Sequence, residues 1–148
     1  MSYHSLYYHL IFATKHRRNY MNETQLEEMY KYITGVLKNI KARLFIINGP
    51  PDHVHIALST NPDISISDFA RSIKANTSRW IHQRFEGLKD FAWQEGYSVF
   101  SVSKSNMPQV VRYIQNQREH HKIVTFEEEL KKFLKKHQID YNPKYFPG

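Results

Sequence analysis

The sequence predicts an α+β fold in which two helices cover one face of a four-stranded antiparallel sheet. Short apolar and aromatic runs alternate with two long segments whose apolar residues recur with the 3.6-residue period of a helix. The expected order through residue 103 is strand, helix, strand, strand, helix, strand. That order is typical of the ferredoxin-like split βαβ arrangement. No linker rich in Gly, Ser or Pro interrupts the 148 residues, so we expect one domain over residues 1–148.

The first half of the chain is expected to form a strand, a helix and a hairpin. The first strand is rich in Tyr, Leu, Ile and Phe. Asn22, with Gln25 three residues later, predicts a capping box at the start of an amphipathic helix. Gly49-Pro50-Pro51 ends the second strand and turns the chain back into the third. The expected strands span residues 5–13, 42–48 and 53–59, and the expected helix spans residues 21–41.

The second half adds one strand and three helices. Each helix is introduced by Ser, Asn or Thr, with an acidic or amide residue three positions later, which is a typical N-terminal signal. The expected N-cap residues are Ser65, Asn106 and Thr125. The sheet core should extend over about residues 1–103, followed by an appended helix at about 106–121 and a last helix and tail at 125–148. The remaining expected elements are a helix over 65–85, a strand over 97–103 and an irregular tail from 139.

Composition narrows the class of protein. The chain has no cysteine, which excludes disulfide scaffolds, cysteine zinc sites and thiol catalysis. Its net charge of +7 and its pI near 9.5 favour a polyanionic partner such as nucleic acid. Nine histidines and ten tyrosines are many for this length, and they are compatible with a phosphate-handling enzyme. No segment is long and apolar enough to span a bilayer and no secretory signal is recognisable, so we expect a cytoplasmic protein without a membrane partner.

A His-Val-His sequence on the expected third strand is the first candidate for chemistry. Residues i and i+2 of a strand point to the same face, so His53 and His55 should lie side by side while Val54 and Ile56 face the other way. Two adjacent imidazoles can hold one divalent metal ion. The alternative is a pair of partly exposed strand histidines that bind nothing, because such a pair arises easily in a chain with nine histidines.

The second candidate lies on the expected helix over 106–121. Tyr113 and Gln117 are four residues apart and share a face, and His120 and His121 follow one turn later. Tyr113 would stand at the border between core and solvent. The alternative is an ordinary interfacial tyrosine that buries its ring and leaves its hydroxyl in water.

Together these segments resemble the single-tyrosine HUH transposases, the small enzymes of bacterial and archaeal insertion sequences that move as single-stranded DNA. The resemblance covers nearly the whole chain, and the order and spacing of its pieces are more specific than any single piece. One departure is His16, where the family more often has an aromatic residue. The matching segments are residues 8–18, 51–55, 93–97, 100–103, 113–114, 117, 120–122, 125–129 and 139–145.

The resemblance implies the chemistry of a DNA strand transferase and single-strand endonuclease. Tyr113 would attack a phosphodiester, form a 5′-phosphotyrosine and release a 3′-hydroxyl. Because tyrosine has an unperturbed pKa near 10, it needs positive charge nearby. His53, His55 and Gln117 would hold Mg²⁺ or Mn²⁺, and an all-neutral ligand set would leave the ion its full charge. His120 and His121 are possible auxiliary residues, or a solvated helix end.

The resemblance also implies the partners. The substrate would be single-stranded DNA with hairpins at the element ends, handled in the cytoplasm of a prokaryote in association with the nucleoid. A homodimer is expected, with the tyrosine helix of one subunit completing the site of the other. Two groups of basic residues could contact DNA phosphates, although an ordinary solvated surface is the alternative for both. These are Lys15, His16, Arg17 and Arg18 after the first strand, and Arg71, Lys74 and Arg79 on the second long helix.

Two other functions remain open on the sequence alone. One is a non-catalytic nucleic-acid-binding module on the same fold, because residues 96–102 faintly resemble an RNA-binding sheet motif. The other is a domesticated relative that processes chromosomal hairpins with the same chemistry. The acidic residues 127–129, followed by lysines, are expected only to complement the dipole of the last helix.

Overall fold

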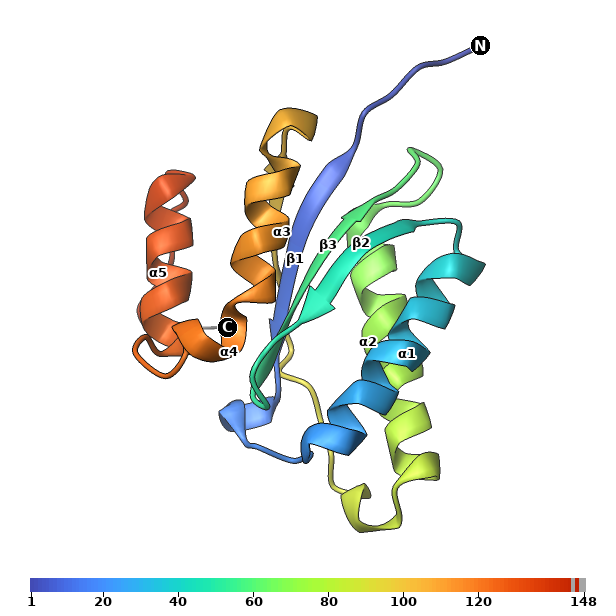
Figure 1. The fold of residues 1–148 in the computed structure, drawn as a ribbon, viewed down its shortest axis with the longest axis vertical. Coiled ribbons are helices and arrows are strands. Elements are labelled where there is room, and N and C mark those ends of the chain that lie inside the picture. Colours follow the sequence, from blue (N-terminus) through green and yellow to red (C-terminus); the bar gives the residue numbers. More distant parts are fainter. Residues whose placement is uncertain (145, 147–148) are drawn as a thin grey trace.

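The computed structural model describes residues 1–144 and 146. Its centre is a four-stranded sheet with the order β2-β3-β1-β4, in which all neighbouring strands are antiparallel (Figure 1). The strands are β1 (Tyr7–Ala13), β2 (Arg43–Asn48), β3 (His53–Ser59) and β4 (Ser98–Val102). This topology confirms the expected α+β, ferredoxin-like fold.

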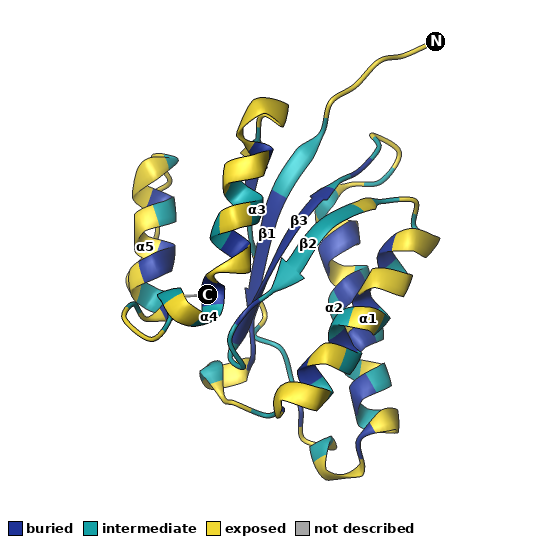
Figure 2. Cartoon of the chain, viewed as in Figure 1, coloured by how far each residue is buried: buried dark blue, intermediate teal, exposed yellow. Residues whose placement is uncertain are grey.

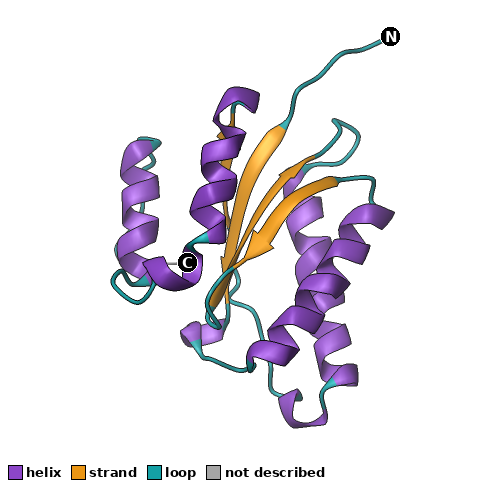
Figure 3. Ribbon diagram, viewed as in Figure 1, coloured by secondary structure: helices purple, strands orange, loops and turns teal. Residues whose placement is uncertain are grey.

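Helices cover both faces of the sheet (Figures 1 and 3). α1 (Glu23–Asn39) and α2 (Ile66–Arg84) lie on one face. α3 (Met107–Gln115), α4 (Gln117–His120) and α5 (Phe126–Lys136) lie on the other side. No helix among the described residues is long and apolar enough to cross a membrane. In the described part of the chain, short 3-10 helices connect these elements: η1 (Lys15–Arg17), η2 (Glu86–Leu88) and η3 (Lys104–Asn106).

The strand alternation divides the interior into separate cores. On β1, Leu10 and Phe12 pack against α1 and α2, whereas Ile11 and Ala13 face α5. Because both faces are covered, the central strands are buried along most of their length (Figure 2). The larger core is completed by Leu26, Met29, Ile33 and Leu37 of α1 and by Phe69, Ala70, Ile73 and Ile81 of α2.

Three of the expected helix caps are confirmed. The side chain of Asn22 accepts a hydrogen bond from the N–H of Gln25 (2.9 Å), and the Gln25 side chain accepts one from the N–H of Asn22 (3.0 Å). Ser65 and Thr125 each accept a hydrogen bond from the backbone N–H three residues later. These bonds satisfy N–H groups that a helix start would otherwise leave without partners.

The expected cap at Asn106 is wrong. Asn106 has helical backbone angles (φ −90°, ψ −11°) and makes no side-chain cap, because η3 precedes α3 without a break. An N-cap residue needs an extended backbone. Ser103 has one (φ −72°, ψ 149°), and its hydroxyl accepts the hydrogen bond from the N–H of Asn106.

The helix expected over 106–121 is divided at Asn116 into α3 and α4. Nδ2 of Asn48, on β2, donates to the carbonyl oxygens of Ile114 (3.0 Å) and Gln115 (3.3 Å). These are among the last carbonyls of α3, which have no partner within the helix. The side chain of Asn48 therefore satisfies the end of α3 and fixes the place where the chain turns into α4.

Candidate metal and tyrosine site

The two strand histidines lie on the sheet face that α3, α4 and α5 cover. Their neighbours Val54 and Ile56 pack in the opposite core, against α1 and α2. His53 and His55 are 2% and 0% exposed, and their ring centroids are 5.1 Å apart. Both rings are thus fully buried, rather than partly exposed as the alternative without a ligand would require.

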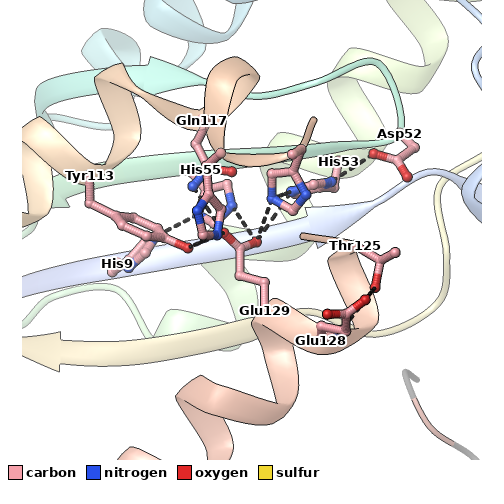
Figure 4. Close-up of polar contacts among 11 residues, drawn as sticks. His9, Asp52, His53, His55, Tyr113, Gln117, Thr125, Glu128 and Glu129 are labelled. Atoms are coloured by element: carbon pink, nitrogen blue, oxygen red, sulfur yellow. Dashed lines mark hydrogen bonds and ion pairs between the residues drawn. The ribbon is translucent and has the colours of Figure 1, made fainter. Parts of the chain in front are cut away.

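Glu129, on α5, lies at the centre of this face with 2% of its surface exposed. Its Oε1 is 3.0 Å from Nε2 of His55, 3.0 Å from Nε2 of His121 and 3.4 Å from Nε2 of His53. Its Oε2 accepts hydrogen bonds from the Tyr113 hydroxyl and from Nε2 of Gln117 (2.9 Å) (Figure 4). One carboxylate therefore joins the imidazoles to the candidate nucleophile.

The burial of Glu129 follows from the way α5 packs. Phe126, Leu130 and Leu134 repeat on one face of α5 and pack against Ile11 and other residues of the sheet. Glu129 shares that face, so docking of the helix carries its carboxylate inward. The expectation that residues 127–129 only complement the helix dipole is therefore wrong for Glu129. The helical spacing from residue 126 to residue 134 was the signal that could have identified it.

His9, on β1, is a second residue that the sequence analysis missed. It is 2% exposed, and its Nε2 lies 2.7 Å from Nδ1 of His55. His53 has a corresponding partner, because its Nδ1 lies 2.7 Å from Oδ1 of Asp52. Both strand histidines thus use Nδ1 for an outer partner and direct Nε2 toward Glu129. The alternation of His9 with Ile11 on one face of β1 was the available signal.

Burial and charge shift the pKa values in this cluster in different directions. Burial lowers the pKa of His55 to about 4. Burial also opposes protonation of His53, but Asp52 and Glu129 outweigh it and raise its pKa. For Glu129, burial is outweighed by hydrogen bonds from the histidines, which hold its pKa well below the usual range. Glu129 therefore remains an anion. Among the strand histidines, His53 is the one that most readily takes up a proton and balances this negative charge.

Tyr113 is half-buried on α3 among aromatic rings of the same site. Its ring centroid is 5.9 Å from that of His55 and 6.3 Å from that of His9, and its hydroxyl is 3.3 Å from Nε2 of His120. Burial and the nearby negative charge of Glu129 raise its pKa well above the ordinary value. Without added positive charge, the hydroxyl is therefore held as a neutral phenol.

The other predicted residues of the appended helix differ in position. Gln117 is fully buried, and its Oε1 has no hydrogen-bond partner among the described residues. The side chain of His121 is only 7% exposed and faces Glu129, so it is not part of a solvated helix end. The side chain of His120 is 29% exposed and lies at the rim, 3.6 Å from Oε2 of Glu129.

The basic turn after β1 lies beside the site. His16 and Arg17 have positive φ angles of 56° and 54°, which are uncommon for residues other than glycine and belong to a tight turn. Both residues line a cavity of about 620 Å³ that also contacts Asp52 and His121. Arg17 pairs with Glu127 (2.8 Å). Of the two other predicted residues, Lys15 is exposed and Arg18 pairs with Asp90.

The predicted basic face of α2 is only partly free. Nζ of Lys74 donates to the carbonyl oxygens of residues 94, 95 and 96, at 2.6, 2.8 and 3.0 Å. The ammonium group of Lys74 therefore already has three backbone acceptors within the protein, and these compete with the predicted contact to DNA. Arg71 and Arg79 are exposed, and their partners Asp68 and Asn76 lie on the same helix.

The fold and the site together define a class of protein. A central strand that carries His53-Val54-His55, in a four-stranded antiparallel sheet and facing Tyr113 on a following helix, is the arrangement of the single-tyrosine HUH transposases. A family model described as IS200-like transposases matches residues 2–117, and the chain belongs to this family.

Individual relatives agree with this assignment. The chain is 27% identical to the ISDra2 transposase TnpA of Deinococcus radiodurans, over 78% of this chain and 86% of the relative. It is 29% identical to the IS200 transposase of Salmonella typhimurium, over 78% of this chain and 79% of the relative. Among solved structures, a D. radiodurans R1 protein assigned as a transposase has a TM-score of 0.66 and 28% identity, over 79% of this chain and 95% of that one. A REP-associated tyrosine transposase bound to a REP hairpin has a TM-score of 0.63 and 20% identity, over 84% and 76%, and shares the fold.

Proposed function

We propose that this transposase cleaves and rejoins single-stranded DNA through a covalent bond between Tyr113 and a 5′-phosphate. The observation that carries the proposal is the convergence of Tyr113, His53 and His55 around Glu129 in a buried cluster. A non-catalytic binding module would gain nothing from burying three imidazoles and a carboxylate beside a tyrosine, since burial of ionisable groups is costly.

The chemistry requires Tyr113 to act as a nucleophile. Its phenolic oxygen forms a bond to phosphorus as the phenolic proton leaves, and the bond from phosphorus to the 3′-oxygen breaks. The departing 3′-oxygen takes up a proton and becomes a hydroxyl. The phosphotyrosine retains the energy of the broken phosphodiester, so a second 3′-hydroxyl can attack it and restore Tyr113 without ATP. Cleavage and rejoining are then the same reaction in opposite directions.

The residues of the site fit a divalent metal ion. His53 and His55 direct Nε2 to one point, and Oε1 of Gln117 is buried with no donor among the described residues, as a ligand atom would be. We propose these three residues as ligands of Mg²⁺ or Mn²⁺, with two imidazoles favouring Mn²⁺. When bound, the ion supplies positive charge that stabilises the phosphate and the phenolate. His120, at the rim beside the Tyr113 hydroxyl, is proposed to contact DNA or to relay the phenolic proton.

The proposed substrate is single-stranded at the cleavage site and carries a hairpin nearby. Lys15, Arg17 and Arg18 lie in or next to the basic turn beside the site and would supply positive charge for the DNA, while Asp52 and Glu127 also line the adjoining cavity. The fold neighbour solved with a REP hairpin makes a hairpin the first DNA to test. Whether the gene serves a mobile element or a chromosomal repeat does not change this chemistry.

The test is covalent capture. Purified protein is incubated with Mn²⁺ and a hairpin oligonucleotide library with single-stranded flanks, and adducts are separated on denaturing gels. We expect a shifted band whose peptide map places the nucleotide on Tyr113. Tyr113→Phe should give no adduct, while Tyr97→Phe at an exposed tyrosine should behave as wild type. An adduct of normal yield with Tyr113→Phe would contradict the proposal.

Sharing of the site between two subunits is a separate proposal. In the described chain, α3 packs on its own sheet and Tyr113 lies beside its own His55. The segment between β4 and α3 comprises only residues 103–106 and permits docking of α3 within one chain, so docking on a partner subunit has to be tested separately. Mixing His53→Ala/His55→Ala with Tyr113→Phe decides between the arrangements. Shared sites restore cleavage in heterodimers, whereas sites within one chain leave the mixture inactive.

A further inference from the structure

We propose that Glu129 and His121 are ligands of the same metal ion, so that α5 completes the centre with a carboxylate and a third imidazole. The inference rests on the proposed metal site at His53 and His55. It changes the ligand set from a neutral one to one that carries a single negative charge. It also places one essential ligand on α5, which lies outside residues 2–117, the segment that the family model matches.

The distances are those of ligands around one ion. Ligand atoms from His53, His55, His121 and Glu129 all lie within 4.8 Å of one another. Oε1 of Glu129 is 3.0–3.4 Å from the three Nε2 atoms, and Nε2 of His53 is 3.1 Å from Nε2 of His121. Neighbouring ligands of an octahedral ion, each about 2.1 Å from the metal, stand about 3 Å apart. A small inward rearrangement is enough to bring four donor atoms onto one ion.

Outer partners orient the donor atoms. Nδ1 of His53 lies against the carboxylate of Asp52, and Nδ1 of His55 lies against His9. When Nδ1 carries the proton, Nε2 has its lone pair free for a metal, and such outer hydrogen bonds are typical of metal-binding histidines. Nε2 of Gln117 donates to Oε2 of Glu129 and holds the carboxylate in place. Three of the four donors are therefore positioned by contacts that involve no part of a substrate.

The donor set has a consequence for metal choice. Three imidazoles and one carboxylate suit Mn²⁺ and other first-row transition ions better than Mg²⁺, which prefers oxygen ligands. The carboxylate leaves a dication with one net positive charge, which still attracts a phosphate. The bound metal ion would also neutralise part of the negative charge of Glu129, which otherwise faces the Tyr113 hydroxyl.

The test measures metal binding directly on the full chain without DNA. Mn²⁺ titrations followed by calorimetry and by electron paramagnetic resonance compare wild type, Glu129→Gln and Glu128→Gln. The control removes the same charge one residue earlier, at an exposed position whose oxygen interacts with Thr125. We expect Glu129→Gln to bind Mn²⁺ at least ~100-fold more weakly, His121→Gln at least ~10-fold more weakly, and Glu128→Gln as wild type.

Two further measurements keep the outcome decisive. Visible spectra of the Co²⁺-loaded proteins should change with Glu129→Gln and not with Glu128→Gln, because only a direct ligand alters the coordination. Glu129→Asp, which keeps the charge on a shorter side chain, should recover part of the affinity if Glu129→Gln folds poorly. Equal Mn²⁺ affinity and equal Co²⁺ spectra for Glu129→Gln and wild type would overturn the inference. In that event the His53, His55 and Tyr113 proposals would still stand, whereas a wild type that binds no metal would refute the metal site as a whole.

Discussion

The hydroxyl of Tyr113 donates a hydrogen bond to the carboxylate of Glu129, so the candidate nucleophile is held by an anion from another helix. Burial and this anion raise the pKa of Tyr113. The same carboxylate faces three imidazoles through its other oxygen. Protonation of these imidazoles, or binding of a metal ion to them, therefore determines how much of the negative charge of Glu129 acts on Tyr113.

Removal of the strand histidines should abolish cleavage while DNA binding persists. His53→Ala with His55→Ala removes two proposed ligands, whereas we expect the affinity for a hairpin to depend mainly on phosphate contacts elsewhere. Adduct formation should fall below detection, and the hairpin dissociation constant should change by less than about threefold, measured by fluorescence anisotropy. EDTA should have the same effect on wild type, with excess Mn²⁺ restoring the reaction. Cleavage that continues in EDTA would show that the metal has no part in it.

His9 should act as a positioning residue for His55. Nε2 of His9 lies 2.7 Å from Nδ1 of His55 and would accept the Nδ1 proton when Nε2 of His55 binds a metal ion. His9→Leu removes that acceptor and should weaken Mn²⁺ binding ~10–100-fold, the usual cost of losing an outer partner. His9→Gln supplies an amide oxygen and should recover much of the affinity, as measured by calorimetry. If both variants bind equally well, His9 serves packing alone.

The metal-free protein should lose stability through His55 as the pH falls. The folded pKa of His55 is about 4, below the value near 6.5 expected in the unfolded chain. Between these values the unfolded state binds the extra proton, so the free energy of unfolding decreases from pH 6.5 toward pH 4. His53, whose pKa is raised, acts in the opposite direction: its contribution is present below about pH 6.5 and is lost as the pH rises. Glu129 stays ionised throughout this range.

This dependence can be isolated by denaturant unfolding in EDTA at pH 7.5 and pH 5. Relative to His55→Gln, wild type should lose about 2 kcal/mol more between these conditions. The subtraction removes the contributions of groups that both proteins share. Identical losses in the two proteins would mean that His55 has an ordinary pKa in the folded state.

Lys74 should contribute to stability and not to DNA binding. Lys74→Met leaves the carbonyl oxygens of residues 94–96 without their donor and should lower the free energy of unfolding by about 1–3 kcal/mol. Arg71→Gln and Arg79→Gln, at exposed positions, should change it by less than about 1 kcal/mol. If these arginines contact phosphates, each loss should reduce the slope of log affinity against log salt by about 1. A reduced slope for Lys74→Met at unchanged stability would reverse this assignment.

The sequence predicted those structural features that a local periodic pattern determines. Strand alternation correctly placed His53 and His55 on one face, and capping patterns correctly marked the starts of α1, α2 and α5. The division of α3 from α4 was not predictable, because it depends on Asn48, more than sixty residues earlier in the chain. Such tertiary contacts override local helix signals.

The unforeseen part of the site has a similar cause. Glu129 stands in an acidic run at a helix start, where charge alone favours a solvated position. Its burial depends on the docking of α5 through Phe126 and Leu130, and the favourable partners that make burial tolerable come from β3 and α4. The local sequence pattern predicts the helix and its apolar face. It does not predict which polar residue on that face finds hydrogen-bonding partners in the folded protein.

The long sequence separation within the site has a consequence for how the protein folds. His55 and Glu129 are 74 residues apart and meet only after α5 docks on the sheet. Contacts of this kind close large loops and therefore form late and slowly. β1 likewise pairs with β3 and β4, which lie much later in the sequence, so its hydrogen bonds in the sheet also close large loops. We expect the surroundings of Tyr113 to be among the last parts to assemble, so that partly folded or nascent chains carry a tyrosine with no means of activating it.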